Sequence, residues 1–333
     1  MNNFSYIRPD TLADALDLLK GNDQLAILAG GTTMVDLMKL GVVEPAALLD
    51  ITGIESLDRY EVGTDQLRFG ALARMSDVGD DDELAATFPA LTESLWKAAS
   101  PQLRQAARLG GNILQRTRCP YFRETHYACN KRSPGSGCAA LEGGKTNLHA
   151  ILGGSQSCVA MYPGDWAQVL VAFDATVDVA SANGKRRLDF KDLHVAPGDT
   201  PDVETSLQSG EIITDIALSV VPAMKGSCYM KARDRASYAF ASASAAVGIA
   251  FDGDVISDVR IALGGVAAVP WRANEAEQYL KGEPLSEDRA RQAGRIAFSA
   301  ATPLEGSAYK TELGASVVAG ALMTAQKRAQ QEG

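Results

Sequence analysis

The chain has 333 residues, of which 46% are hydrophobic and 22% are charged. That length is enough for two or three packed units, and the composition is that of an ordinary soluble protein. A formal net charge of −9 argues against nucleic acid as a partner, because phosphate binding requires a basic face. No stretch approaches the roughly twenty uncharged apolar residues of a membrane-spanning helix.

The N-terminal residues 1–9 lack the basic start and the apolar run of a signal peptide. We therefore expect a chain that is made in the cytoplasm and has no export signal of its own. Transfer to the periplasm would depend on a partner that carries such a signal.

The N-terminal part of the chain predicts a small unit with βαβ-like order. A helix is indicated over residues 10–20, because apolar residues recur there at helical spacing behind a capping Asp10 or Thr11. It is followed by a buried strand over 25–28, a helix over 34–40 and a second strand over 46–51.

A glycine pair, Gly30-Gly31, lies where the first strand turns into the second helix. Paired glycines let backbone N–H groups approach a ligand, and the following helix N-terminus favours negative charge. Thr32 and Thr33 add hydroxyl donors, so a phosphate or pyrophosphate is the expected ligand. The motif is not Gly-x-Gly-x-x-Gly, so a Rossmann fold does not follow. An ordinary tight turn explains the pair equally well.

A second glycine pair follows a strand predicted over 67–72 and a helix predicted over 90–99. It lies within residues 109–112, beside the side-chain amide of Asn112. Two separated glycine turns can hold the two ends of an extended dinucleotide. The structural alternative is a β-bulge or a sheet corner.

Four of the five cysteines lie in one irregular segment, residues 116–158. Cys119, Cys129, Cys138 and Cys158 are separated by nine, eight and nineteen residues. Four gathered thiols form two disulfides, a zinc site or an iron–sulfur cluster, or they are unconnected small hydrophobic residues. Structural zinc sites usually contain a close cysteine pair, so these wide gaps favour a 4Fe–4S cluster and leave zinc second.

Basic residues accompany the cysteines and would balance the negative charge of thiolates and a cluster. They are Arg116, Arg118, Arg123, Lys131 and Arg132.

Beyond the cysteines, Asp165 is placed to cap a helix over 166–172. A hairpin is predicted around Asn183-Gly184, and a strand over 211–218. A composition change near Pro222 suggests a domain boundary. After it come strands over 226–231, 242–251 and 256–266, then helices over 272–280, 286–301 and 311–331. Antiparallel strands followed by helices indicate an α+β unit.

The three histidines, His126, His149 and His194, are scattered along the chain. No Ser/His/Asp or histidine–metal constellation follows from them, so we expect surface or structural roles. Cys228 lies in a predicted strand, where a buried thiol is the ordinary interpretation.

Four segments carry a resemblance to a known family. The chain resembles the FAD-binding (medium) subunits of molybdenum hydroxylases, the xanthine dehydrogenase family, over nearly its whole length. It is especially similar to the flavin subunits of bacterial periplasmic-type molybdenum aldehyde oxidoreductases. The segments are residues 28–39, 110–122, 129–143 and 259–267.

The resemblance implies an α+β fold. Its first part is an FAD-binding domain of the PCMH, or vanillyl-alcohol-oxidase-like, type over residues 1–222, with subdomains of about 1–55 and 56–222. The cysteine-rich loop 116–158 lies within it. A C-terminal domain over 223–333, like that of CO dehydrogenase flavoproteins, has a three-stranded antiparallel sheet plus helices.

The resemblance also implies which residues contact FAD. A first loop wraps the pyrophosphate, a second contacts the flavin, Asp165 lies near the ribose and adenine end, and Ile213 and Lys231 line the flavin ring. Ala98 stands where some relatives have an aromatic flavin contact, so that contact is in doubt here. The two loops comprise Ile27, Leu28, Ala29, Gly30, Gly31, Thr32, Thr33 and Met34, and Leu109, Gly110, Gly111 and Asn112.

A subgroup of the family carries the cysteine insertion and binds a 4Fe–4S cluster there, which implies Cys119, Cys129, Cys138 and Cys158 as ligands. The implied partners are a large subunit with a molybdenum cofactor, a small subunit with 2Fe–2S clusters, and an external electron acceptor. This chain would transfer electrons within a heterotrimer and would contain no catalytic acid or base.

Two alternatives belong to other classes. One is a stand-alone flavin oxidase of the PCMH type, although such chains are usually longer and often link the flavin covalently. The other is a zinc-stabilised scaffold without flavin, which would leave both glycine pairs unexplained.

Overall fold

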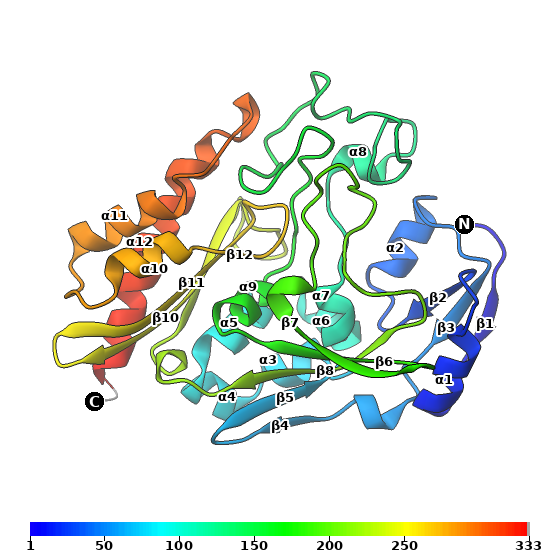
Figure 1. The fold of residues 1–333 in the computed structure, drawn as a ribbon, viewed down its shortest axis with the longest axis horizontal. Coiled ribbons are helices and arrows are strands. Elements are labelled where there is room, and N and C mark those ends of the chain that lie inside the picture. Colours follow the sequence, from blue (N-terminus) through cyan, green and yellow to red (C-terminus); the bar gives the residue numbers. More distant parts are fainter. Residues whose placement is uncertain (332–333) are drawn as a thin grey trace.

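Residues 1–331 are described by a computed structural model, and within them the strands form three separate sheets (Figure 1). The sheets follow one another along the chain from the N-terminal unit to the C-terminal one. Mixed helix and sheet content was predicted, and the α+β fold class is confirmed.

The first sheet has the order β1-β3-β2, and all of its neighbouring strands run parallel. Parallel pairing of β2 with β3 across α2 confirms the predicted βαβ order. Thr11 caps α1 as proposed, because its side-chain oxygen accepts from the Asp14 amide. The elements are β1 (Ser5–Ile7), α1 (Leu12–Leu19), β2 (Leu25–Leu28), α2 (Met34–Lys39) and β3 (Ala47–Asp50).

The second sheet is antiparallel with the order β4-β5-β8-β6-β7. Its β6–β7 hairpin turns at Asn183-Gly184, as the sequence predicts. The strands are β4 (Tyr60–Val62), β5 (Gln66–Gly70), β6 (Thr176–Ser181), β7 (Gly184–Asp189) and β8 (Ile212–Ser219). The helices that accompany it are α3 (Met75–Gly79), α4 (Asp82–Thr87), α5 (Pro89–Trp96), α6 (Pro101–Ala106), α7 (Leu109–Ile113) and α9 (Trp166–Ala172).

The C-terminal sheet has four strands, in the order β12-β11-β10-β9, and not the three that were expected. The extra strand, β12 (Trp271–Arg272), pairs with Ala262 and Leu263 of β11. Its two residues follow a proline and give no alternating pattern. The other elements are β9 (Cys228–Ala232), β10 (Ala243–Asp252), β11 (Val255–Gly264), α10 (Asn274–Leu280), α11 (Glu287–Ala297) and α12 (Tyr309–Gln331).

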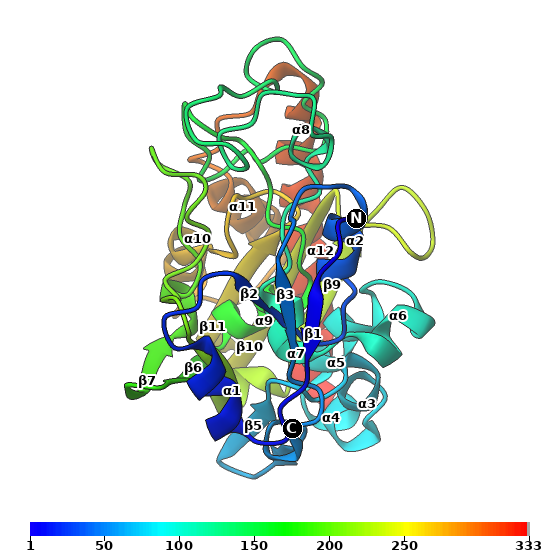
Figure 2. The same cartoon turned by 90° about the vertical axis from the view of Figure 1, so that its right-hand side faces the viewer.

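The cysteine-rich segment is irregular, as predicted, apart from the short helix α8 (Pro120–Arg123). Figures 1 and 2 both show it at one end of the molecule, beyond the sheets. Backbone hydrogen bonds from Ile151 and Leu152 to the Val266 carbonyl attach its C-terminal part to the residues that follow β11. Single-turn 3₁₀ helices lie at Glu55–Leu57, Phe190–Asp192, Pro222–Met224 and Glu305–Ser307.

Helix α9 lies between the second and third sheets, and every one of its residues is buried. Its Trp166 belongs to one apolar core together with Phe69 of β5 and with Tyr229 and Ala262 of the third sheet. The opposite face of the third sheet packs on α10, α11 and α12 in a second core. One continuous core therefore joins the second sheet to the third.

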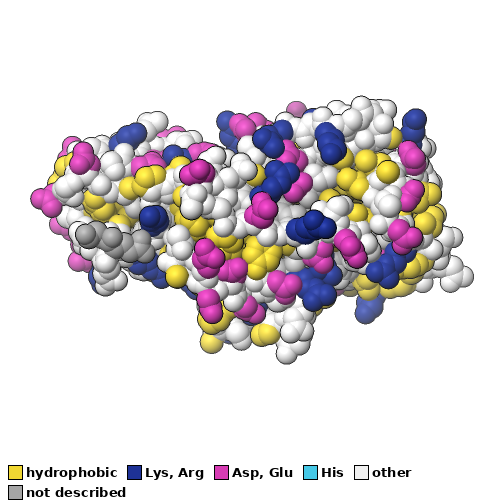
Figure 3. Space-filling view, turned by 90° about the horizontal axis from the view of Figure 1, so that it is seen from below, with side chains coloured by type: hydrophobic (Ala, Val, Ile, Leu, Met, Phe, Trp, Pro, Cys, Tyr) yellow, Lys and Arg dark blue, Asp and Glu magenta, His cyan; other side chains and the backbone are white. Residues whose placement is uncertain are grey.

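Acidic and basic side chains alternate over the face in Figure 3, without a continuous basic stripe. Among residues 1–331, no helix has the length and apolar character needed to cross a bilayer.

Candidate functional site

The first glycine pair forms the turn between β2 and α2. Gly31 has a φ of 72°, a conformation that residues with a Cβ rarely adopt. At Gly30 an added Cβ would lie 2.0 Å from the Ala106 carbonyl oxygen. This turn is thus pressed against the end of α6, and both glycines are required by the fold itself.

The second glycine pair is not an open turn, a bulge or a sheet corner, because it lies within the short helix α7. A Cβ at Gly110 would lie 2.9 Å from the Ala71 Cβ, so packing excludes a side chain there. At Gly111 the nearest atom, the Ala29 Cβ, would be 3.9 Å away. The protein leaves open space over Gly111, and that space belongs to a cavity.

Two cavities meet at the glycine pairs. The first has a volume of about 500 Å³ and the second about 330 Å³. Thr32, Thr33 and Gly111 line both, so the two cavities adjoin at these residues, and we describe them as the two chambers of one candidate site. Each chamber is the size of a small-molecule pocket. An extended ligand could occupy both chambers with its middle at the glycine backbones.

The first chamber lies between the first and second sheets. Among the predicted FAD contacts, those that line it are Ile27, Ala29, Gly30, Gly31, Thr32, Thr33, Met34, Gly110, Gly111 and Ile213. Arg108 and Arg116 also line it, and the sequence had not marked them for this site. Leu28 and Leu109 line neither chamber, and Leu109 is fully buried in the core.

The second chamber contains Ala98, Asn112 and Asp165. Asn112 Oδ1 is buried and has no hydrogen-bond partner among the described residues, so it can accept a hydrogen bond from a ligand. Ile213 lines only the first chamber, whereas Lys231 pairs with Asp165 beside the second. These two residues therefore do not share one ring-sized chamber.

Asp165 does not cap α9 through its side chain, which corrects the prediction. Its carboxylate instead accepts hydrogen bonds from the Tyr229 hydroxyl and from Lys231 Nζ, the latter at 2.8 Å. The side chains of Asp165 and Lys231 are only 4% and 1% exposed. Burial raises the pKa of Asp165, while the adjacent Lys231 opposes that rise. The pair links α9 to β9 at the wall of the second chamber.

A segment between β9 and β10 closes the second chamber. Arg235, Tyr238 and Phe240 line it, and Tyr238 has a positive φ of 51°. The Arg118 guanidinium lies 4.9 Å from the centre of the Phe240 ring. These contacts escaped the sequence analysis, because the segment is short, irregular and without a motif.

The four cysteines of the irregular segment line one small cavity. All five cysteines lie in the described part of the chain and are free thiols, which removes the disulfide alternative from the structure. Burial raises the pKa of Cys119 to about 12. The cavity holds about 10 Å³, room for one water. Within residues 1–331 no group of three or more Cys, His, Asp or Glu side chains is arranged to hold a metal ion, so a bound cluster requires the thiols to rearrange.

Most of the basic residues near the cysteines have other partners. Arg116 and Lys131 pair with Glu204, at 2.7 and 3.4 Å. Arg132 donates to main-chain carbonyls, among them that of Phe122 at 2.7 Å. Arg118 and Arg123 both pair with Asp36 of α2. These contacts hold the cysteine-rich loop in place. The sequence had led us to expect instead that the basic side chains would balance the charge of the thiolates.

His149 is the one histidine beside the cysteines. It lines their cavity, is 1% exposed, and its Nε2 lies 3.2 Å from the Cys119 sulfur. The sequence analysis assigned it a surface or structural role, because thirty residues separate it from Cys119. His126 is exposed, and His194 is buried with Nε2 2.8 Å from the Ile113 carbonyl oxygen.

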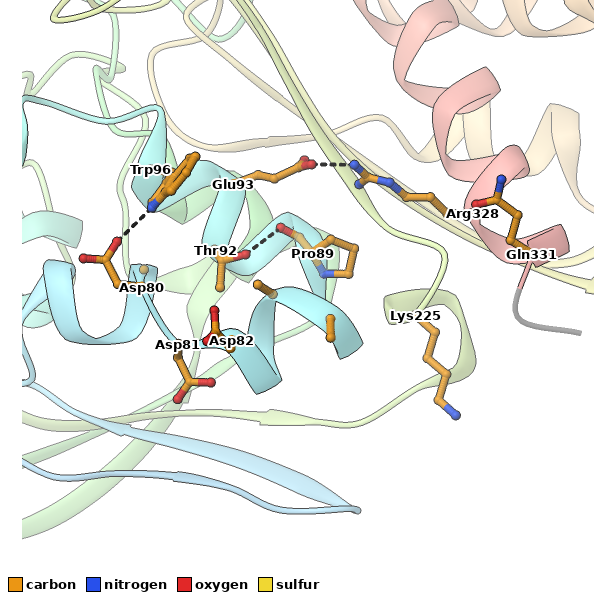
Figure 4. Close-up of a pocket in the computed structure, with 13 residues that line it drawn as sticks. Asp80, Asp81, Asp82, Pro89, Thr92, Glu93, Trp96, Lys225, Arg328 and Gln331 are labelled. Carbon is orange, nitrogen blue, oxygen red and sulfur yellow. Dashed lines mark hydrogen bonds and ion pairs between the residues drawn. The ribbon is translucent and has the colours of Figure 1, made fainter.

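Another cavity, of about 590 Å³, lies elsewhere, between α4, α5 and the end of α12 (Figure 4). Its charged groups are largely paired. Glu93 binds Arg328 at 2.6 Å, and the Trp96 indole donates to Asp80 at 2.8 Å. No glycine turn, cysteine or unpartnered buried side chain reaches it, so we place the functional site at the two smaller chambers.

Two family profiles match the chain. Residues 2–221 match the FAD binding domain in molybdopterin dehydrogenase, and residues 227–325 match the CO dehydrogenase flavoprotein C-terminal domain.

Relatives of known function match over most of their length. The chain is 40% identical to the aldehyde oxidoreductase FAD-binding subunit PaoB of Escherichia coli, over 99% of this chain and 100% of that protein. It is 28% identical to the glyceraldehyde dehydrogenase medium chain of Sulfolobus acidocaldarius, over 86% of this chain and 83% of the relative.

Solved structures share the fold. A chain of carbon monoxide dehydrogenase from Hydrogenophaga pseudoflava superposes with a TM-score of 0.77 at 23% identity, covering 98% of both chains. A chain of the enzyme from Oligotropha carboxidovorans gives 0.77 at 23%, covering 98% of this chain and 99% of that one. The structural likeness shows the fold, and the profiles together with the 40% relative show the family. The chain belongs to the family of FAD-binding subunits of molybdenum hydroxylases.

Proposed function

We propose that this chain is the electron-transfer subunit of a molybdenum-dependent aldehyde oxidoreductase complex. The observation that carries the proposal is the two-chambered site whose waist is formed by Thr32, Thr33 and Gly111. FAD has two ring systems joined by a pyrophosphate, which suits two chambers joined by glycine backbones. When bound, FAD can take up electrons one at a time and release them in pairs.

The chambers suggest how FAD is held. The backbones of Gly30 and Gly31, with the Thr32 and Thr33 hydroxyls, would face the pyrophosphate. Open space over Gly111 would admit it closely. Ile27, Met34 and Ile213 would contact one ring system in the first chamber. Asn112 Oδ1, and Asp165 held by Lys231, would face the other in the second.

We propose that the four clustered cysteines hold a 4Fe–4S cluster. Four free thiols that line one cavity, two of them buried and two half-buried, fit thiolate ligation, and the wide spacing of Cys119, Cys129, Cys138 and Cys158 fits a cluster better than zinc. Lys131 is close enough to lower the pKa of Cys158 against the dominant effect of burial. We favour a structural role for this cluster, since the long loop has little secondary structure of its own.

The partners follow from the relatives. Two of them are an aldehyde oxidoreductase FAD-binding subunit and a glyceraldehyde dehydrogenase medium chain, and the names of both refer to aldehyde substrates. We infer a large subunit with the molybdenum cofactor and a small subunit with 2Fe–2S clusters that deliver electrons to this chain, and an external acceptor that removes them.

The test is cofactor analysis of the complex purified anaerobically after co-expression of the three subunits. We expect one FAD per copy of this chain and four irons beyond those of the small subunit. In the Cys138→Ser variant, this chain should lose the extra iron and keep FAD. FAD without extra iron, or zinc in its place, would overturn the cluster. Absence of FAD would overturn the flavin site.

The role of the cluster is tested with the same variant. A structural cluster predicts that Cys138→Ser impairs assembly of the complex, measured by size-exclusion chromatography with light scattering. Intact assembly combined with loss of electron flow to FAD would instead establish a relay.

A further inference from the structure

We infer that His149 donates a hydrogen bond from Nε2 to the sulfur of Cys119 when that sulfur is bound to iron, and thereby raises the reduction potential of the cluster. The inference rests on the proposed 4Fe–4S cluster. It adds a fifth side chain, which the sequence spacing of the cysteines does not reveal.

The contact itself is already formed. His149 Nε2 and Cys119 Sγ are 3.2 Å apart, well within hydrogen-bond range for sulfur. A free thiol and an imidazole can share this hydrogen in either direction. An iron-bound sulfur has lost its proton and can only accept, so the nitrogen must donate.

A neutral imidazole has one N–H, which can lie on either ring nitrogen, so the direction of the contact with Cys119 depends on which nitrogen carries the hydrogen. The Nδ1 of His149 is buried and forms no hydrogen bond within the described residues. The tautomer with the proton on Nε2 is therefore free to form, and the short sulfur contact favours it.

The surroundings hold the ring in place. The Tyr121 ring stacks on His149 with centroids 5.9 Å apart, and the His149 amide donates to the Thr146 carbonyl at 3.0 Å. The amide of the next residue, Ala150, donates to the Val159 carbonyl at 2.9 Å. This hydrogen bond connects the part of the loop around His149 to the part that contains Cys158. A donor fixed in this way loses little entropy when the cluster binds.

The chemical consequence follows from charge. Reduction adds one electron to a cluster whose sulfurs already carry negative charge. A hydrogen bond to a sulfur stabilises the reduced form more than the oxidised form, and this raises the potential. His149 is thus a positioning and tuning residue and not an iron ligand, since four cysteines already complete the ligand set.

The experiment compares three variants in the complete complex. His149→Leu removes the donor, His149→Gln offers an amide N–H in its place, and His126→Leu removes an exposed histidine of the same loop, whose side chain is 67% exposed. Iron and FAD are quantified first, and the cluster is then titrated with a reductant under EPR at temperatures that separate it from the 2Fe–2S signals.

We expect full iron content in all three and a lower potential in His149→Leu alone. The ratio of reduced to oxidised cluster at a fixed ambient potential should fall about tenfold, a shift of about 59 mV for one electron. His149→Gln should recover most of it, and His126→Leu should match the wild type.

An iron-replete His149→Leu complex with an unchanged potential overturns the inference alone. Loss of iron from both His149 variants also overturns it, because the residue would then be a ligand or a structural support. A wild-type complex without the extra iron overturns the cluster proposal itself, and that result is visible before any variant is made.

Discussion

Gly110 and Gly111 are neighbours in α7 with opposite surroundings. Gly110 packs against Ala71, while a Cβ on Gly111 would meet nothing closer than 3.9 Å. Alanine is favoured over glycine in helices by up to about 1 kcal/mol. We expect Gly111→Ala to raise the free energy of unfolding of the FAD-free chain by up to that amount and to lower its FAD affinity. Urea denaturation and flavin titration measure the two effects.

Gly110→Ala is the matched control for this pair. Its Cβ would overlap Ala71, so the chain should lose about 1–3 kcal/mol of stability. If Gly111→Ala bound FAD as tightly as the wild type, the pyrophosphate would not pass over that glycine.

His194 makes stability depend on pH. Burial lowers its pKa from 6.5 to about 4 in the folded chain. The unfolded chain therefore takes up this proton at a higher pH, and stability is lost as the pH falls from about 6.5 to about 4. The loss attributable to this residue is about 3 kcal/mol. In His194→Phe, the stability difference between pH 7 and pH 4 should be smaller by that amount in urea titrations, whereas His126→Phe should leave it unchanged.

Individual residues differ in how far the sequence reveals them. Gly30, Gly31 and the cysteines were recognised because their motifs are short and local. Asp165 was noticed for the wrong reason, since its partners Tyr229 and Lys231 lie more than sixty residues away and no spacing rule connects them. The contact of His149 with Cys119 was also missed, because no spacing rule connects two residues that are thirty positions apart.

At the scale of elements, Asp36 connects α2 to the cysteine loop. Its carboxylate pairs with Arg118 and Arg123, each at 2.9 Å, and Arg118 also contacts the Phe240 ring beside the second chamber. Asp36→Asn should cost about 1 kcal/mol, because the pairs are half-exposed. It should also speed tryptic cleavage after the arginines of residues 116–132.

The control for the Asp36 variant is Asp17→Asn, because Asp17 is exposed to solvent on α1. Mass spectrometry of the tryptic fragments measures the digestion rates of the two variants. Equal rates would show that Asp36 does not hold the cysteine-rich loop.

Elements with a clear period were predicted well, and short ones were not. Residues 25–28 form β2 and the last helix extends over residues 309–331, as the apolar pattern indicates. Helices α3, α6 and α7 have only five or six residues each, too few for a helical period to show. Tertiary contacts, such as Gly110 against Ala71, set their conformation.

For the whole molecule, the predicted domain boundary near Pro222 stays a prediction. The core gives a reason to expect that the two sides do not fold separately. Trp166 of α9 shares its cluster with Tyr229, Ala246 and Ala262 of the third sheet. Removal of that sheet would expose a helix whose residues are all buried. We expect a fragment of residues 1–222 to bind the dye ANS and to aggregate, whereas the full chain should not.

Gly248 of β10 lies at this interface, where a Cβ would be 2.5 Å from the Ala223 carbonyl oxygen and 2.6 Å from the Phe173 ring. Gly248→Ala should therefore destabilise the chain by about 1–3 kcal/mol. Because the core is continuous, calorimetry should show one transition that moves to lower temperature as a whole. Gly79→Ala is the control, because its Cβ would make an ordinary 3.4 Å contact with Leu95 of α5. It should leave the transition temperature nearly unchanged. Two transitions, with only the second shifted by Gly248→Ala, would mean that the C-terminal unit folds independently of α9.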